Sequence, residues 1–478
     1  MSETLSFIKR MGLVGLTYIV NLLIGIILIP VFTKGQPLEY YGVWVQVNVS
    51  LSLVPALTCL GLPYTLVRYL PGEKDPERIR ESFYSILALV FLLNLVSSPI
   101  IAYLIIRYAA GNVAGLAPLL AVLLLIQAVY FVGVAYLRAM QKVRVYSILM
   151  IIQNILMAMG VGGAVIYGYG LKGAMMALLT VNAMITMVIL YRVMLDIGVK
   201  IPSFSYLREH IAFGLPTIFG NFSDWIVSSS DRYLIGYFLG VIYVGYYNPA
   251  YSIVSVINIF LWPLIFLLPA RLSELYDGGD MVRIKSYFRY SLKYYLLLAI
   301  PSIFGLSALS GPLLTILSTP EIAENAWSVV PIVGAGVGVY GVYAIISQAF
   351  VLEKKTSFIA RLWMVVATVN FVLNMVAIPY LGINGAALTT LIAYILALAV
   401  TVRYALKFFT IPFNLSDVLK SILSGAVMYL IVSGLNPSGM VGILFTVAAG
   451  AAVYIALIFL LRTFDGEEIE MFRSLLRS

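Results

Sequence analysis

Apolar runs of nearly constant length follow one another along the whole chain, and only short polar stretches separate them. A helix needs about 20 mostly apolar residues to cross the hydrocarbon core of a bilayer. Counting such runs predicts fourteen spanning helices. They lie near residues 12–33, 41–63, 83–106, 113–137, 145–168, 171–191, 212–234, 243–268, 291–312, 326–351, 358–379, 383–402, 415–434 and 439–461. No interval between them accommodates a soluble domain, so the pattern predicts an all-α polytopic membrane protein.

The basic residues alternate from one loop to the next. If the N-terminus lies inside, 26 of the 30 Lys and Arg residues fall in inner loops and tails, and only Lys34, Arg107, Lys172 and Arg232 fall on the outer half. This asymmetry predicts that both termini are cytoplasmic, which requires an even number of spans.

Composition agrees with this assignment. The chain of 478 residues is 62% hydrophobic and only 11% charged, with a net charge of +9 and a mean hydropathy of +1.00. The basic excess is explained by topology, so no nucleic-acid partner is expected. The chain has one cysteine, Cys59, which excludes an internal disulfide. It has one histidine, His210, which argues against a histidine-based zinc site and against a Ser-His-Asp triad. We therefore predict no catalytic residues, no metal and no cofactor.

The two halves of the chain repeat each other. The stretch "RIRESFYSIL" at 78–87 returns as "RIKSYFRYSL" at 283–292, Gly42 corresponds to Gly245, and Arg68 corresponds to Arg271. Each half holds six spans, so the halves are parallel repeats around a central cavity, as in transporters that work by alternating access. The predicted domains are a six-helix lobe over 1–200, a second six-helix lobe over 201–410, and two extra helices with a cytoplasmic tail over 411–478.

An acidic stripe marks the predicted span at 212–234. Its positions are spaced i, i+3, i+7 and i+10 on one helical face, namely Asn221, Asp224, Ser228 and Asp231. In the first half Asn21 is equivalent to Asn221, but the other three positions are apolar. Charges are costly inside a bilayer. We therefore predict that this stripe, Asn21 and Arg232 line a substrate or ion pathway. A structural contact between helices is one alternative, and a position of Asp231 and Arg232 in head-group water at the outer interface is the other.

Individual roles follow from charge. Asp224 lies near mid-depth and is a candidate proton acceptor or ligand for a small cation such as Na⁺. Arg232 follows Asp231 directly and could pair with it locally. Because adjacent helix positions diverge by about 100°, we expect its partner elsewhere. Four further basic residues are candidate contacts for a head-group phosphate, with simple membrane anchoring or loop exposure as the alternative: Arg68, Arg271, Lys34 and Arg107.

Three segments resemble a known family. They are "YYGVW…GLPYTLVRYLP", "DRYLIGYFLGVIYVGYYNPAY" and "NFVLNMVAIPYLGINGAALTTLIAY". They look like the polysaccharide transporter (Wzx-type flippase) family of the multidrug/oligosaccharidyl-lipid/polysaccharide exporter superfamily. The matching positions are Gly42, Gly61, Arg68, Asp231, Gly245, Tyr247, Asn374, Pro379, Gly382, Gly385 and Ala386. Asp231 matches a recurrent acidic position of that family.

The resemblance implies twelve core helices in two lobes around a V-shaped cavity. It also implies flipping of a polyprenyl-phosphate- or polyprenyl-pyrophosphate-linked oligosaccharide from the inner to the outer leaflet, driven by an ion gradient or the membrane potential. The expected partners are this lipid-linked glycan and membrane lipids. We expect a monomer in the plasma (inner) membrane of a prokaryote that does not act as an enzyme.

Three other functions compete with this interpretation. A cation-coupled multidrug exporter of the same superfamily would suit acidic residues in an apolar cavity. A membrane-embedded glycosyltransferase or polymerase would need an outer loop with catalytic carboxylates, and the largest outer loop, near 313–325, offers only Glu321 and Glu324. A lipid scramblase would lack ion coupling.

Overall fold

The computed structural model describes residues 2–108, 114–407, 409–410, 413–464 and 468. Over these residues the secondary structure is helical, with short 3₁₀ segments at Leu70–Gly72, Ala114–Leu116 and Ser255–Ile257. In the described part, eleven helices are long and apolar enough to cross a membrane, or twelve if one bent pair forms a single span. The prediction of an all-α polytopic membrane protein is therefore confirmed.

Two features separate the larger of these numbers, twelve, from the fourteen predicted spans. The helix α8 (Leu207–Phe238) holds the acidic stripe and does not pass the same test of apolar character. The helix α16 (Thr356–Ala405) is 50 residues long and covers two predicted spans, with Gly382 at φ 60° and ψ −144° interrupting its helical backbone. A left-handed φ of this kind is readily adopted only by glycine. The count of fourteen stays a prediction.

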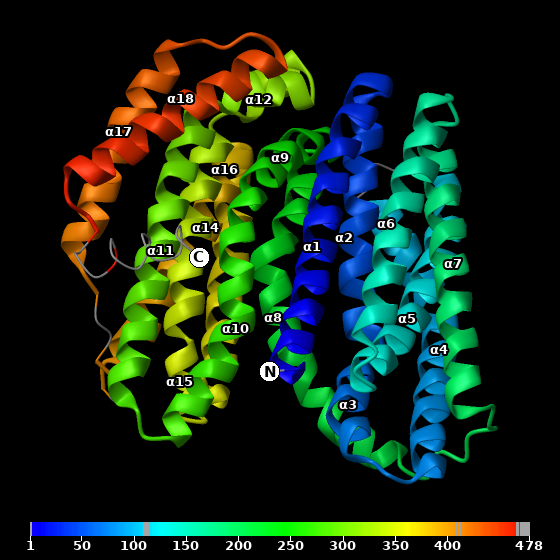
Figure 1. Cartoon of the computed structure of the whole chain (residues 1–478). Helices are drawn as coiled ribbons and strands as arrows, with labels where there is room; N and C mark the ends of the chain where they lie inside the picture. The colour runs from blue at the N-terminus through cyan, green and yellow to red at the C-terminus, as the bar shows by residue number, and fades with distance from the viewer. Residues whose placement is uncertain (1, 109–113, 408, 411–412, 465–467, 469–478) are drawn as a thin grey trace. The chain divides into compact units, whose positions relative to one another are not determined.

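Contacts group the chain into two compact units, and the first comprises residues 1–248 and 363–386. Besides α8 and a part of α16, it holds α1 (Ser2–Gly35), α2 (Leu38–Thr58), α3 (Leu62–Tyr69), α4 (Pro76–Tyr108), α5 (Ala117–Ala139), α6 (Val143–Ile166), α7 (Gly170–Ile197) and most of α9 (Val241–Val254). Helix α5 packs mainly on α4 and α7, whereas α6 packs on α1 and α7 (Figure 1).

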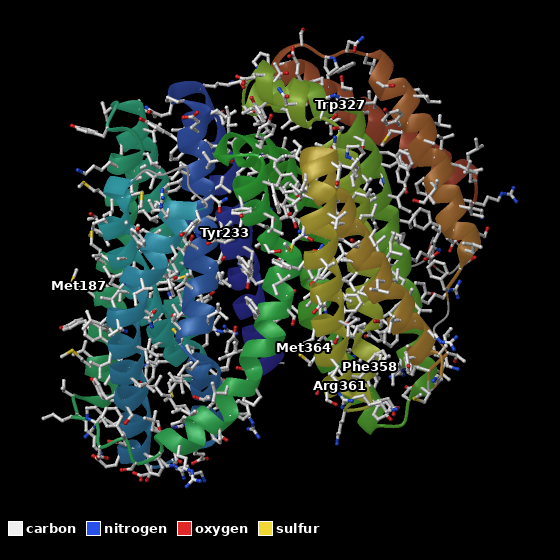
Figure 2. All side chains as sticks on the ribbon, turned by 180° about the vertical axis from the view of Figure 1, so that it is seen from behind. Met187, Tyr233, Trp327, Phe358, Arg361 and Met364 are labelled. Carbon is white, nitrogen blue, oxygen red and sulfur yellow. The ribbon has the colours of Figure 1, made fainter. Side chains whose placement is uncertain are left out.

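Large apolar side chains cover the outer surface of these helices. Met187 on α7 is 62% exposed and points away from its neighbours (Figure 2), and Leu92, Val96 and Ile100 on α4 are also exposed. A soluble monomer rarely shows such extended apolar surface, whereas lipid favours it.

The segment after α7 is tied to the start of α4. The Lys200 ammonium lies 3.1 Å from Glu77 and 3.4 Å from Glu81, and the Ser203 N–H donates to the Glu81 carboxylate at 2.8 Å. The hydrogen bond to Glu77, and then the one to Glu81, raise the pKa of Lys200. The segment that connects the two sequence repeats is thus bonded to the first repeat through Lys200 and Ser203.

Helix α8 lies in the first unit and packs along α2 and α3. The break between α2 and α3 bends the chain by 66° and places Gly61 at φ 69°. A Cβ at Gly61 would stand 2.1 Å from the Gly214 carbonyl oxygen of α8. Glycine at 61 therefore provides both the left-handed turn and the space for α8 to approach.

The repeat-related glycines Gly42 and Gly245 make reciprocal contacts between α2 and α9. A Cβ on Gly42 would stand 2.1 Å from the Val241 carbonyl oxygen, and one on Gly245 would stand 2.9 Å from Leu38. Residues 38 and 42 on one side and 241 and 245 on the other have the same spacing, so equivalent positions of the two repeats touch each other. This is the pattern of a local two-fold contact.

We expect Gly42→Ala to loosen the α2–α9 contact, because the new methyl group would meet backbone, which cannot rotate away. Overpacking of this kind costs about 1–3 kcal/mol. Thermal melting of the purified protein in detergent measures it. The matched control is Gly25→Ala in α1, where nothing lies within 4 Å of the new Cβ. Equal melting temperatures for the two variants would contradict the prediction.

The second unit comprises residues 249–362 and 387–478. Besides the remainder of α9 and α16, it holds α10 (Asn258–Asp277), α11 (Met281–Ala308), α12 (Ser310–Leu317), α13 (Pro320–Ala326), α14 (Val329–Ile346), α15 (Gln348–Leu352), α17 (Leu415–Gly434) and α18 (Gly439–Leu460). Helix α11 packs against α14 and α17. The predicted lobes 1–200 and 201–410 and the segment 411–478 stay predictions.

A buried ion cluster anchors Glu468 within the second unit. The Lys293 ammonium on α11 lies 2.5 Å from Glu468 and 3.7 Å from Asp417 on α17, and the Tyr294 hydroxyl donates to Glu468 at 3.0 Å. All three charged side chains are buried. The single ammonium faces both carboxylates, with one carboxylate in excess, and the Tyr294 hydroxyl donates to Glu468, so the cluster links α11 and α17 to Glu468.

Candidate functional site

The polar face of α8 divides into two parts with different surroundings. Asp224 is exposed, and among the described residues no hydrogen bond or ion pair engages its carboxylate. Ser228 is half-buried, and its hydroxyl lies near the Trp225 carbonyl at 3.4 Å and the Ser229 hydroxyl at 3.3 Å. The side chain of Asn221, the fourth predicted member, lies outside the described residues.

Asp231 and Arg232 form a buried ion pair. They are 1% and 5% exposed, and the guanidinium donates to the carboxylate at 2.8 Å. The Tyr247 hydroxyl of α9 donates to the second carboxylate oxygen at 2.7 Å, and the guanidinium lies over the Tyr247 ring at 5.4 Å. We call Asp231, Arg232 and Tyr247 the buried ion-pair cluster. Its charges are mutually compensated, as burial requires.

The expectation that Arg232 would find its partner away from Asp231 is wrong. The Arg232 side chain reaches back along the helix, where its guanidinium also donates to the Ser228 carbonyl at 2.6 Å. Long side chains on a helix point toward its N-terminus. This direction, together with the length of the arginine stem, overcomes the angular divergence of adjacent positions.

Hydrogen bonds attach this part of α8 to α2. The Gln46 side-chain amide donates to the Arg232 carbonyl at 2.6 Å, and the hydroxyls of Ser50 and Tyr233 lie 2.7 Å apart. Figure 2 marks the position of Tyr233. The outer half of the stripe is thus held in a network across α2, α8 and α9.

Asp224 belongs to a second group of charges. The Tyr64 hydroxyl on α3 lies within electrostatic range of the Arg138 guanidinium on α5 and of the Asp224 carboxylate. We call Tyr64, Arg138 and Asp224 the charged trio. Arg138 and Asp224 are both exposed, and neither forms an ion pair or hydrogen bond through its side chain within the described chain. Tyr146 on α6 also interacts with Arg138. The trio therefore offers one cation and one anion to a ligand.

Of the remaining predicted residues, Arg68 lies four positions after Tyr64 on α3, and the others lie on α1, α4 and α10. Asn21, Lys34, Arg68 and Arg107 are exposed on α1, α3 and α4. Arg271, in the second unit, pairs with Glu274 at 2.6 Å and donates to the Tyr287 hydroxyl at 3.3 Å. Their roles at a head-group phosphate stay predictions.

Arg138 was missed by the sequence analysis because every inner loop carries a basic residue, so its charge was assigned to topology. A signal was nevertheless present. Gln127, Phe131, Val134 and Arg138 are spaced i, i+4, i+7 and i+11, which places an amide and a guanidinium on one face of an apolar span.

In the described part of the chain, the apolar helices of membrane length define a polytopic membrane protein, and charged side chains without a protein partner are typical of a pathway for ions or polar substrates. A family model described as "Polysaccharide biosynthesis protein" matches residues 37–324, which is more than half of the chain. The chain belongs to this family.

Comparisons with individual proteins agree with that assignment. The chain is 23% identical over 221 residues to the probable low-salt glycan biosynthesis flippase Agl15 of Haloferax volcanii. This match covers 46% of the chain and 47% of the relative, so the alignment spans about half the length of the curated protein.

Solved structures share the fold. The lipid II flippase MurJ in an inward closed conformation is similar with a TM-score of 0.73 and 17% identity, over 95% of this chain and 99% of that one. An inward-facing multidrug resistance MATE family transporter of the MOP superfamily is similar with a TM-score of 0.68 and 17% identity, over 82% of this chain and 94% of that one.

Proposed function

We propose that this protein is a flippase that moves a polyprenyl-phosphate- or polyprenyl-pyrophosphate-linked oligosaccharide from the inner to the outer leaflet by alternating access. Three findings support this function: the polysaccharide biosynthesis family, the partial relative named as a glycan biosynthesis flippase, and the fold shared with a lipid II flippase. The protein then transports its substrate without catalysing a covalent step.

The observation that carries the proposal is the charged trio. A lipid-linked sugar has an anionic phosphate, and a guanidinium binds such a group with paired, charge-assisted hydrogen bonds. Arg138 has no carboxylate bonded to it within the described chain and is exposed. Asp224, also unpaired there, would take up H⁺ or Na⁺ in a gradient-driven cycle. A purely structural pair of charges would instead be bonded to each other, as Asp231 and Arg232 are.

The finer architecture is part of the same proposal. Fourteen spans in two parallel lobes plus two C-terminal helices, with both termini cytoplasmic, account for the distribution of 26 of the 30 basic residues. The reciprocal contacts of Gly42 and Gly245 support the repeat. We place the protein as a monomer in the plasma membrane of a prokaryote. The pathway would include Asn21, Asn221, Asp224 and Ser228, with Asp231 and Arg232 bracing its wall.

Reconstitution into liposomes tests the proposal. A fluorescent polyprenyl-pyrophosphate-linked sugar is placed in both leaflets, and dithionite quenching reports how quickly the inner pool becomes accessible. We expect protein-dependent flipping that an imposed proton or sodium gradient accelerates. Absence of flipping with and without a gradient would overturn the function, and flipping that ignores both gradients and the membrane potential would indicate a scramblase.

The alternative of a cation-coupled multidrug exporter is supported by the shared fold with a MATE family transporter. The charged trio argues against it, because Arg138 would repel a cationic drug from the vicinity of Asp224. Export of cationic dyes from liposomes, faster than flipping of the lipid-linked sugar, would favour the exporter.

A further inference from the structure

Four uncharged polar side chains meet in the first unit, away from the charged trio and the buried ion-pair cluster. The Tyr130 hydroxyl of α5 donates to Gln153 Oε1 of α6 at 2.8 Å, and Gln153 Nε2 donates to Asn182 Oδ1 of α7 at 2.7 Å. Asn182 Nδ2 then donates to Gln127 Oε1 of α5 at 3.4 Å. We call Gln127, Tyr130, Gln153 and Asn182 the amide cluster.

The cluster is a directional chain of donors that ends on an open group. Every side-chain amide oxygen in it accepts one of these bonds, and the amide nitrogen that donates none of them is that of Gln127. In the described part of the chain, Gln127 Nε2 has no acceptor, and it is not among the fully buried polar atoms. Gln127 and Gln153 are half-buried, while Asn182 is 3% exposed and forms the back of the cluster. Polarisation along such a chain strengthens the terminal donor.

A closed amide contact in the same unit shows the contrast. Asn94 on α4 is fully buried, accepts a hydrogen bond from the Thr58 hydroxyl at 2.6 Å, and donates to the Val90 carbonyl at 2.9 Å. Its oxygen and its amide nitrogen are thus both engaged within the protein, as expected for a structural contact between helices. In the amide cluster, by contrast, the amide nitrogen of Gln127 donates to no group within the described chain.

Position along α5 connects the cluster with the charged trio. Gln127 lies at the middle of this 23-residue helix, and Arg138 lies eleven positions further on, roughly 16 Å away along the axis. The partly exposed face that links them holds Phe131 and Val134. The other partly exposed face of α5 is entirely apolar and consists of Pro118, Val122, Leu125, Ile126 and Val129. The apolar face is compatible with contact to lipid. The face with Gln127 and Arg138 carries polar groups that can bind a polar ligand.

We propose that the amide cluster is a subsite for the uncharged sugar of the substrate, with Gln127 Nε2 donating to a hydroxyl or acetamido oxygen. This inference rests on the proposed flippase function. It adds the chemical class of the substrate group that binds near the middle of α5. The cluster contains no charge, so it does not select a phosphate. It has three amide oxygens and one hydroxyl but no carboxylate, and each amide oxygen already accepts a hydrogen bond, so it does not match the carboxylate-rich oxygen site that a metal cation needs. A neutral acceptor is the ligand that fits.

The test compares two probes on the purified full-length protein in nanodiscs. One is a polyprenyl pyrophosphate with a neutral N-acetylhexosamine disaccharide, and the other is the same pyrophosphate lipid without sugar. We expect wild type to bind the glycosylated lipid more tightly. Gln127→Leu should weaken this binding about five- to tenfold, as loss of one neutral hydrogen bond implies, and change the binding of the bare lipid less than twofold.

Two variants serve as controls. Gln127→Met keeps the length of the side chain and removes its amide, so it should reproduce the effect and replaces Gln127→Leu if that variant does not fold. Asn94→Leu should lower the melting temperature and leave the ratio of the two affinities unchanged.

An unchanged affinity ratio in the Gln127 variants, or wild-type affinities that are equal for the two lipids, would overturn the subsite and leave the flippase function standing. Failure of wild type to bind either lipid would instead overturn the proposed function.

Discussion

Asp224→Asn is expected to lower gradient-driven flipping about 10- to 100-fold while expression, membrane insertion and melting temperature stay those of wild type. The magnitude follows from the loss of one charged interaction with the coupling ion, which is worth about 1.5–3 kcal/mol. Stability should not change, because the carboxylate is exposed and has no partner among the described side chains. The measurement is the initial rate of flipping in liposomes with and without an imposed gradient.

Glu39→Gln is the matched control for Asp224→Asn. Glu39 is also an exposed carboxylate, in the first turn of α2, and it is outside the charged trio. The control should flip at the wild-type rate under all gradients. Wild-type rates in Asp224→Asn would remove Asp224 from the coupling mechanism, and a comparable loss in both variants would assign the effect to general surface charge.

Arg232→Ala is expected to destabilise the protein by about 3–5 kcal/mol. The substitution leaves the Asp231 carboxylate buried and without its counter-charge, and an unpaired buried charge carries a penalty of this size. The Gln46 bond to the Arg232 carbonyl persists, since it involves backbone. Thermal melting in detergent and the yield of monodisperse protein report the loss.

A double variant separates the ion pair from other consequences of the truncation. Asp231→Asn combined with Arg232→Met removes both charges, so it should recover much of the stability lost in Arg232→Ala. Asparagine keeps an oxygen that can accept from the Tyr247 hydroxyl. If the single variant melts like wild type, or if the double variant melts no higher than the single one, the Asp231–Arg232 ion pair does not stabilise the protein.

Much of the architecture follows from local physical rules. Membrane-length apolar runs form helices because the bilayer leaves the backbone no other way to satisfy its hydrogen bonds. Helices α5, α6, α17 and α18 therefore begin and end near their predicted limits, whereas α4 begins at Pro76, before the predicted 83, and α7 ends at Ile197, after the predicted 191. The polar character of α8 also follows from sequence. The interruption of α16 at Gly382 lies between the predicted spans 358–379 and 383–402, and the non-helical conformation of this glycine marks the break between them.

The candidate site was predictable only in part. Asp224 was recognised because a carboxylate within an apolar helix is conspicuous in a linear sequence. Arg138 was not, since its distance along the chain from Asp224 hides their common relation to Tyr64. The partner of Arg232 was misplaced because helix geometry gives the direction of a Cβ atom but not the path of a long flexible stem.

The sequence by itself determined the class of the protein and its helical character, and it predicts an orientation from its basic residues and a repeat that relates Gly42 to Gly245. These properties depend on composition and on spacing along one chain. The tertiary structure alone decided which polar groups are compensated: Asp231 is bonded to Arg232 and Tyr247, whereas the side chains of Asp224 and Arg138 and the amide nitrogen of Gln127 have no such partner among the described residues. Compensation depends on distances between helices that are remote in sequence, and only packing sets those distances.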